Sequence, residues 1–539
     1  MTIRFSRHAL RASALLTLLL PASAFLLTWV RLSVALPCVA AVAAAFIGYV
    51  RSGGNRAHGL FGETDDAFFL PVSALLLTVA CALLWTFLSG IGGYFYQNED
   101  HYGRNAIFHD LLDHSWPVYF DDTPYALNYY VAYWILPALI AKAVAFFLGA
   151  GWLWPTANAA LFVQTVWFLL IIFLLLLETT QLPCANKHER LTSKAFGGHL
   201  YGTLAVCLCL LVFVLFSGMD ALLAPFNAEA WRHQIEWWAQ CYQYSSHTTC
   251  LFWVYNQAVP AWLATMLLLS RPRDVGSFAL IGLAALPFSP LPLVGMMIYF
   301  AGMALCLFAR AARRNGIRRG VRTLVSSCLT ARNLFAIAGL APVFCLYFMA
   351  NAASGSAPLR FEPYVYAYGL PLALLRYALF ALVEFGCLSL AMGSRFARDP
   401  MFWLTQLLLL LAPLFKIGYN MDFSMRASIP GLTTLCVYAI RFLLEALPGK
   451  GEKRAMPGGS RFSACALALL LLLGSITPLM EFERGIYKVR EAGTIFLSAD
   501  PFGTVLHPDA DTDNFICRDV YSAPFYRYVA RERPQPPKE

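Results

Sequence analysis

The chain has 539 residues, of which 59% are hydrophobic and only 13% are charged. A soluble domain carries about 25% charged residues, so this composition excludes a soluble enzyme, a disordered chain and a small disulfide scaffold. The formal net charge of +9 does not indicate a nucleic-acid partner. The excess Arg and Lys fall in short loops between apolar runs, where positive charge orients membrane helices.

Apolar runs long enough to cross the hydrocarbon core of a bilayer recur along the whole chain. They predict an all-α polytopic membrane protein with about thirteen crossings. A β-barrel is excluded, because its strands would be about ten residues long and would alternate in polarity. The predicted spans are 12–30, 32–50, 67–96, 157–177, 199–217, 251–269, 276–288, 291–308, 333–350, 368–393, 401–417, 427–447 and 462–480.

The segment 127–149 is also apolar, and it decides the predicted topology. If it crossed, the arginine-rich loop 309–332 and the other basic loops after it would move outside, against the positive-inside bias. We therefore predict a juxtamembrane or re-entrant helix on the outer side, and Lys142 within it agrees with incomplete burial. The N-terminus is then cytoplasmic and the C-terminus extracytoplasmic. The predicted cytoplasmic loops are 51–66, 184–196, 271–274, 309–332, 394–399 and 448–461.

Two parts are predicted along the chain. Residues 1–480 form the transmembrane domain, and its first large outer loop, 97–150, carries juxtamembrane helices. Residues 481–539 are polar, aromatic and proline-containing, which indicates a small extracytoplasmic C-terminal segment.

The loop 309–332 holds the densest group of positive charges in the chain. The positive-inside bias favours an ordinary cytoplasmic loop, and a patch for anionic lipids or for a partner is the alternative. The arginines of the group are Arg310, Arg313, Arg314, Arg318, Arg319 and Arg322.

An acidic pair follows directly after a predicted span in the first outer loop. Glu99 and Asp100 stand at the water boundary, where a partly desolvated carboxylate can act as a general base on a hydroxyl or bind a divalent cation. Helical spacing over 99–112 predicts a short helix along the membrane, with both acids in the first turn, where the helix dipole favours them. The same residues also fit a plain helix cap beside an interfacial aromatic belt.

Two other outer loops contain candidates. Arg426 can hold a phosphate through charge-assisted hydrogen bonds, or it can pair with Asp422. Trp237 and Trp238 can stack on a sugar or rest on lipid headgroups, and we favour the lipid.

Two further pairs of polar residues can be interpreted either as structural or as functional. Arg376 and Glu384 lie eight residues apart in one predicted span, so we expect them to share a helix face and form a structural ion pair. His233 and Glu236 could ligate a metal, but pairs at this spacing are frequent by chance.

The residues 94–149 resemble the first extracytoplasmic loop of GT-C fold glycosyltransferases, most closely the branch that includes the aminoarabinose and protein mannosyl transferases. The shared order is an acidic pair, a Tyr, a Leu-Leu step, Trp116-Pro117 and the aromatic stretch 125–134. Where the family has Lys-Pro-Pro before the Tyr-Tyr pair, this chain has the residues 121–124, Asp-Asp-Thr-Pro.

This resemblance implies a glycosyltransferase that moves a sugar, with inversion, from a polyprenyl-phosphate donor to a glycan or lipid-linked acceptor. The reaction would take place on the outer face of a bacterial cytoplasmic membrane, with membrane lipids as further partners. The family's catalytic base maps onto Glu99 or Asp100. The other residues that we expect at the substrates are His101, Tyr102, Arg104, Asn105, Asn128, Tyr129, Asp422 and Arg426.

We expect Arg104, Arg426 and His101 to steady the leaving phosphate as its charge develops. A divalent metal ion could assist, but no ligand set is specific enough to name one, so the cofactor is left open. The alternative function is a lipid or glycan transporter of the cell envelope, which would place its polar residues near the membrane midplane.

Overall fold

The computed structural model of this chain is about 76% helical. It describes residues 1–52, 58–63, 66–180, 199–227, 234–352, 360–361, 369–416, 421–447, 458–498, 502–510 and 512–532.

Every predicted span coincides with one or more helices in the described residues. Among the residues that the structure describes, eight helical segments are long and apolar enough to cross a membrane by length and composition, which confirms an all-α multi-pass membrane protein. The count of thirteen crossings stays a prediction. The helices are α1 (Arg7–Trp29), α2 (Leu32–Arg51), α3 (Val72–Leu88), α6 (Leu153–Thr180), α8 (His199–Val214), α10 (His247–Ser270), α11 (Phe278–Ala285), α12 (Pro290–Asn315), α14 (Ala331–Met349), α16 (Leu370–Ala381), α17 (Cys387–Phe396), α18 (Pro400–Leu411), α20 (Ile429–Ala446) and α21 (Gly458–Gly474).

The core lies around α10 and α20. The apolar window of α20 is 83% buried, whereas that of α2 is only 22% buried, so α2 lies at the periphery and exposes its apolar side chains. Exposed leucines on outer helices are expected where the surrounding solvent is lipid rather than water.

The strands in the described residues are short antiparallel pairs that tie distant segments together. β1 (Thr2–Ser6) pairs with β4 (Ala67–Pro71), which fixes the N-terminus beside the loop that follows α2. The other pairs are β2 (His58–Gly59) with β3 (Gly62–Glu63), β5 (Ala126–Leu127) with β8 (Ile516–Cys517), and β6 (Arg360–Phe361) with β7 (Phe415–Lys416).

Ion pairs gather the predicted cytoplasmic loops at one end of the bundle. Arg7 and Arg11, at the start of α1, lie 2.5 and 2.6 Å from the carboxylate of Glu178, near the end of α6. Arg332, the second residue of α14, lies 3.2 Å from Asp274, in the loop after α10.

Contacts of α17 and α20 complete this end. Arg395 and Arg441 both bind the carboxylate of Glu445, at 2.7 and 2.9 Å, and Arg441 also donates to the carbonyl of Thr180. Residues 53–57, 64–65, 184–196 and 448–457 of the predicted loops lie outside the described residues. The assignment of this end to the cytoplasm stays a prediction.

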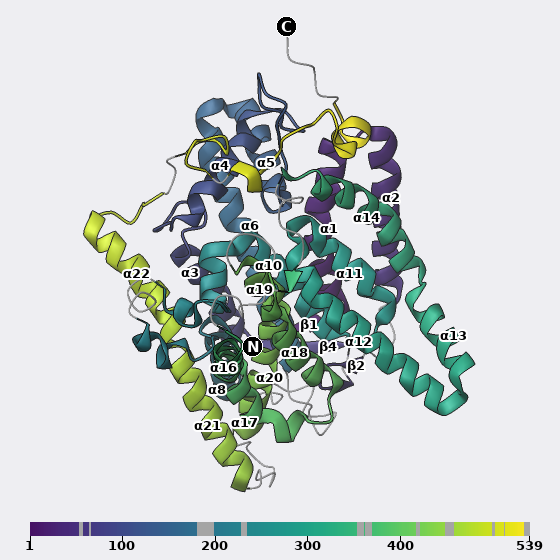
Figure 1. Cartoon of the computed structure of the whole chain (residues 1–539), viewed down its shortest axis with the longest axis vertical. Coiled ribbons are helices and arrows are strands. Elements are labelled where there is room, and N and C mark those ends of the chain that lie inside the picture. The colour runs from purple at the N-terminus through teal and green to yellow at the C-terminus, as the bar shows by residue number, and fades with distance from the viewer. Residues whose placement is uncertain are drawn as a thin grey trace.

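The opposite end is built from α4 (Asp100–Asp113), α5 (Ala132–Leu148) and the C-terminal segment, as Figure 1 shows. The antiparallel β5–β8 pair and a bridge between Val30 and Ala530 attach the C-terminal segment to this end of the bundle. The predicted boundary at 481 falls inside α22 (Ile476–Ala492), which ends at Gly493 in the left-handed conformation, φ +67°.

The segment predicted to be re-entrant forms α5, a helix of 17 residues. Its buried side chains lie in its first part, whereas Phe146 and Phe147 near its end are 83% and 79% exposed. Lys142 donates to the carbonyl of His114 at the end of α4. Thus α5 lies with the elements of the outer end, as the prediction requires, although the crossing itself stays untested.

Candidate functional site

The acidic pair begins α4, as the helical spacing predicted. Asp100 is the first residue of the helix, and Arg104 follows one turn later on the same face. A guanidinium nitrogen of Arg104 lies 3.0 Å from Asp100 Oδ2. The Arg104 side chain is 8% exposed, whereas that of Asp100 is 42% exposed, so the carboxylate is the accessible partner of this pair.

A kink in α10 brings two more groups to Arg104. Pro260 has no N–H to donate to the carbonyl of Asn256, and the backbone leaves helical geometry at Val254, with φ −137° and ψ +37°. Arg104 Nε lies 3.4 Å from Asn256 Oδ1, and its guanidinium lies 5.8 Å from the centre of the Tyr255 ring. These contacts fix the Arg104 head beneath the surface.

The third element of the site is the short helix α19 (Asp422–Ala427), in which Arg426 pairs with Asp422 one turn earlier. Burial works to lower the pKa of Arg426, but Asp422, Tyr129 and Asp100 outweigh burial and raise that pKa above its ordinary value. Asp100 and Tyr129 therefore lie within electrostatic range of Arg426.

Tyr129 lies within electrostatic range of both arginines. Burial raises the pKa of its hydroxyl, while the positive charges of Arg104 and Arg426 oppose that shift. Tyr129 is therefore a neutral hydrogen-bond donor beside two cations. The structure brings together five of the predicted site residues: Asp100, Arg104, Tyr129, Asp422 and Arg426. We call these five residues the outer cluster.

Glu99 differs from Asp100 in its surroundings. It occupies the N-cap position of α4, but its side chain makes no capping hydrogen bond. Its charge acts on Tyr96, whose pKa is raised mainly by burial, while Asp100 acts on Tyr129 and Arg426. The geometry therefore favours Asp100 where the sequence left both residues open.

His101 and Tyr102 contact residues outside the outer cluster. His101 is 1% exposed, and its Nε2 lies 3.2 Å from the carbonyl of Phe252. Burial and the neighbouring Arg104 lower its pKa to about 3, so this imidazole is neutral and cannot offer charge to a phosphate. The ring of Tyr102 packs edge-on against Phe502 of the C-terminal segment.

Two amides of the predicted set hold the structure around the cluster. Asn105 donates to Gln97 Oε1 at 2.9 Å. Asn128 is fully buried and donates both to the carbonyl of Tyr347 and to the hydroxyl of Tyr526. The predicted substrate contacts of these two amides stay untested, but their observed contacts are with the protein.

A second buried polar group lies deeper, around Trp238. The indole N–H of Trp238 lies 3.1 Å from Asp220 Oδ1 and 3.0 Å from Glu384 Oε1. The expected ion pair between Arg376 and Glu384 is wrong, because Arg376 instead donates to Gln240 Oε1 at 3.0 Å. The residues 382–386 form a π-helical turn, which adds a residue to the turn and rotates Glu384 off the face of Arg376.

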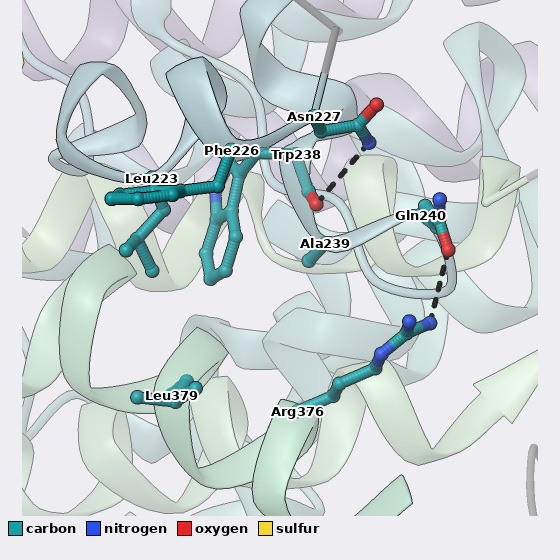
Figure 2. Close-up of a pocket in the computed structure, with 8 residues that line it drawn as sticks. All are labelled: Leu223, Phe226, Asn227, Trp238, Ala239, Gln240, Arg376 and Leu379. Carbon is teal, nitrogen blue, oxygen red and sulfur yellow. Dashed lines mark hydrogen bonds between the residues drawn. The ribbon is translucent and has the colours of Figure 1, made fainter. Parts of the chain in front are cut away.

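Trp238 also forms a wall of an open pocket of about 380 Å³, in which Figure 2 shows the bond between Arg376 and Gln240. Trp237 beside it is 45% exposed, and the choice between sugar and lipid for these two rings stays a prediction. The lining residues are Leu223, Phe226, Asn227, Trp238, Ala239, Gln240, Arg376 and Leu379.

The expected metal pair is only half described, because His233 lies outside the described residues. Glu236 is buried and accepts from the backbone N–H of Ser246 at 2.9 Å. Burial and the nearby Asp220 raise its pKa to about 8. Within the part of the chain that the structure describes, no group of three or more His, Cys, Asp or Glu is placed to hold a metal ion.

No family model matches the chain, and no curated protein or solved structure is significantly similar to it. Function must therefore be inferred from the outer cluster and its position in the fold.

Proposed function

We propose that this protein is a GT-C-like glycosyltransferase that moves a sugar from a polyprenyl-phosphate donor to a glycan or lipid-linked acceptor. The observation that carries this proposal is the meeting of Asp100, Arg104, Asp422 and Arg426 at one end of an apolar helix bundle. A donor of this class needs cations for its phosphate and a carboxylate for the acceptor hydroxyl, and both stand here on rigid helices.

In the proposed reaction, Asp100 is the base. The acceptor hydroxyl gives its proton to the Asp100 carboxylate as its oxygen attacks the anomeric carbon. The bond between that carbon and the phosphate oxygen breaks on the opposite face, so the configuration inverts. The leaving polyprenyl phosphate keeps the bonding electrons, and its growing negative charge is stabilised by Arg426 and Arg104.

The surroundings of these two arginines suit that role. Arg104 is held by Asn256 and by the Tyr255 ring, so little reorganisation is needed when the phosphate arrives. Tyr129 adds a neutral donor near both cations. Asp422 balances Arg426 in the resting state and would yield part of that pairing to the phosphate.

The cluster lies at the end opposite to the arginine-rich loops. By the positive-inside rule we therefore assign it to the outer face of a bacterial cytoplasmic membrane, with the N-terminus in the cytoplasm and the C-terminus outside. The long lipid of the donor would lie along the apolar helices, while its phosphate-sugar head reaches the cluster.

The test uses a strain that lacks this protein and mass spectrometry of its lipid-linked glycans and envelope polymers. The wild-type gene should restore a glycan that has one more sugar, Asp100→Asn should not restore it, and Glu99→Gln should. Thermal unfolding of each purified variant shows that it folds. Restoration by Asp100→Asn would remove the proposed base. Chemically complete glycans that fail to reach the outer leaflet would point to the transporter instead.

A further inference from the structure

The helix α13 (Ile317–Cys328) exposes an apolar stripe that no described part of the chain covers. Ile317, Val321, Val325 and Leu329 recur every four residues and are 72%, 47%, 46% and 59% exposed. The spacing places them along one side of the helix. Figure 1 shows α13 on the outside of the molecule, beside α12.

The other side of α13 fixes its orientation on α12. A Cβ atom added at Gly320 would lie 2.8 Å from Cβ of Ala312 and 3.1 Å from its Cα, so only glycine allows this close approach. The close packing turns the apolar stripe and the neighbouring arginines away from α12. The exposure of the stripe is therefore a property of the fold and not of a loosely attached helix.

Positive charge accompanies the stripe without any acidic counterpart. Arg318 and Arg322 follow one edge of it, and Arg319 lies further around the helix. None of these three forms an ion pair with a described residue. The sequence contains no Asp or Glu between Asp274 and Glu362, so the charge is not neutralised locally.

We propose that α13 lies in the membrane interface and binds the phosphate groups of anionic phospholipids through Arg318, Arg319 and Arg322. The apolar stripe would enter the boundary of the acyl chains, and the long arginine stems would reach back to the headgroups. This assignment is independent of the proposed glycosyltransferase.

Lipid is favoured over an acidic protein by where α13 stands in the chain. It connects α12 to α14, and both are long and apolar enough to cross a membrane. A short helix between two such helices lies at the bilayer surface, where an exposed stripe of Ile, Val and Leu meets acyl chains. Basic residues at that position are typical of recognition of anionic lipids.

The test places the full-length protein in nanodiscs of phosphatidylcholine, with or without phosphatidylglycerol, and follows amide hydrogen exchange of residues 317–329. We expect slower exchange in the anionic nanodiscs. The triple variant Arg318→Gln, Arg319→Gln, Arg322→Gln should lose this difference. It should also retain phosphatidylglycerol about 100-fold more weakly in native mass spectrometry, because each arginine contributes several-fold to affinity.

The matched control removes three exposed arginines at the other end of the molecule. The variant Arg518→Gln, Arg527→Gln, Arg531→Gln changes the net charge equally and should keep the lipid-dependent protection. Thermal unfolding in detergent checks that both variants fold. Equal exchange in the two bilayers, as expected for a helix that awaits a protein partner, would overturn the proposal. Equal loss in the test and control variants would overturn it as well.

Discussion

Glu178 forms buried ion pairs with two arginines at the basic end of the bundle. Its replacement tests quantitatively how far water is excluded from that end. The Glu178 side chain is 1% exposed and lies 2.5 Å from Arg7 and 2.6 Å from Arg11. The two arginines are 8% and 6% exposed. One buried carboxylate therefore neutralises part of two buried guanidinium groups from the first helix.

Glu178→Gln keeps the volume of the side chain but removes the carboxylate that the two buried cations share. Breaking a buried ion pair by removing one partner costs about 3–5 kcal/mol, and the shared position of Glu178 puts this variant at the upper end of that range. The control Asp513→Asn breaks an exposed ion pair with Arg518. The side chain of Asp513 is 50% exposed and that of Arg518 is 62% exposed. An exposed pair contributes about 0–1 kcal/mol.

The assay is reversible unfolding of the purified protein in mixed micelles. A third variant, Arg7→Met, Arg11→Met, Glu178→Met, should recover much of the loss, because apolar side chains of similar volume replace all three charges of this ion-pair network. A loss below about 1 kcal/mol for Glu178→Gln would refute the reasoning, since it would show that water or other groups screen both arginines.

Three further predictions follow from other sites. Burial raises the pKa of Asp110 from 3.8 to about 6. The folded state therefore loses stability as the pH rises from 3.8 to about 6, and protection of the C-terminal segment from hydrogen exchange should fall over that range. Asp110→Asn should abolish this dependence on pH. Gly218→Ala would place a Cβ 2.1 Å from Glu384 Oε2 and should lower the thermal midpoint. Gly393→Ala, where nothing lies within 4 Å, should leave the midpoint unchanged or slightly raised. Arg426→Gln should lower kcat/KM for sugar transfer by about 100-fold, and Arg426→Lys by less.

The helices could be predicted from the sequence because the bilayer imposes a minimum length on an apolar run. The grouping of loops at one end could also be predicted, since the distribution of Arg and Lys sets the orientation of membrane helices. The contact of Arg332 with Asp274 joins two of the loops assigned to one side, and the contact of Arg441 with Thr180 joins the helices α20 and α6 near two others.

The choice between Glu99 and Asp100 could not be predicted, because it depends on which way the first turn of α4 faces. That direction is set by tertiary contacts of Arg104 with Tyr255 and Asn256, about 150 positions away in the chain. The sequence does carry a signal for Asn256, because the polar pair Asn256-Gln257 stands inside an apolar run shortly before Pro260. This signal does not show which residue Asn256 contacts.

The prediction of an ion pair between Arg376 and Glu384 was wrong for a local reason. The spacing rule for helix faces assumes 3.6 residues per turn, and the π-helical turn between the two residues breaks that assumption. Gly218 opposite Glu384 is the other half of the explanation. The carboxylate occupies the space that any larger side chain at 218 would fill, and there it accepts from Trp238.

The C-terminal segment belongs to the candidate site even though none of its residues enters the outer cluster. Asn128 lies next to Tyr129, and its backbone N–H donates to the carbonyl of Phe515 at 2.7 Å. Its side chain donates to the hydroxyl of Tyr526. Both partners come from the segment after α22, so the loop that carries Tyr129 is held partly by residues nearly 400 positions further along the chain. The buried Asn128 thus acts on the cluster by positioning its neighbour, and a polar C-terminal segment on an otherwise apolar protein has a physical reason to be ordered.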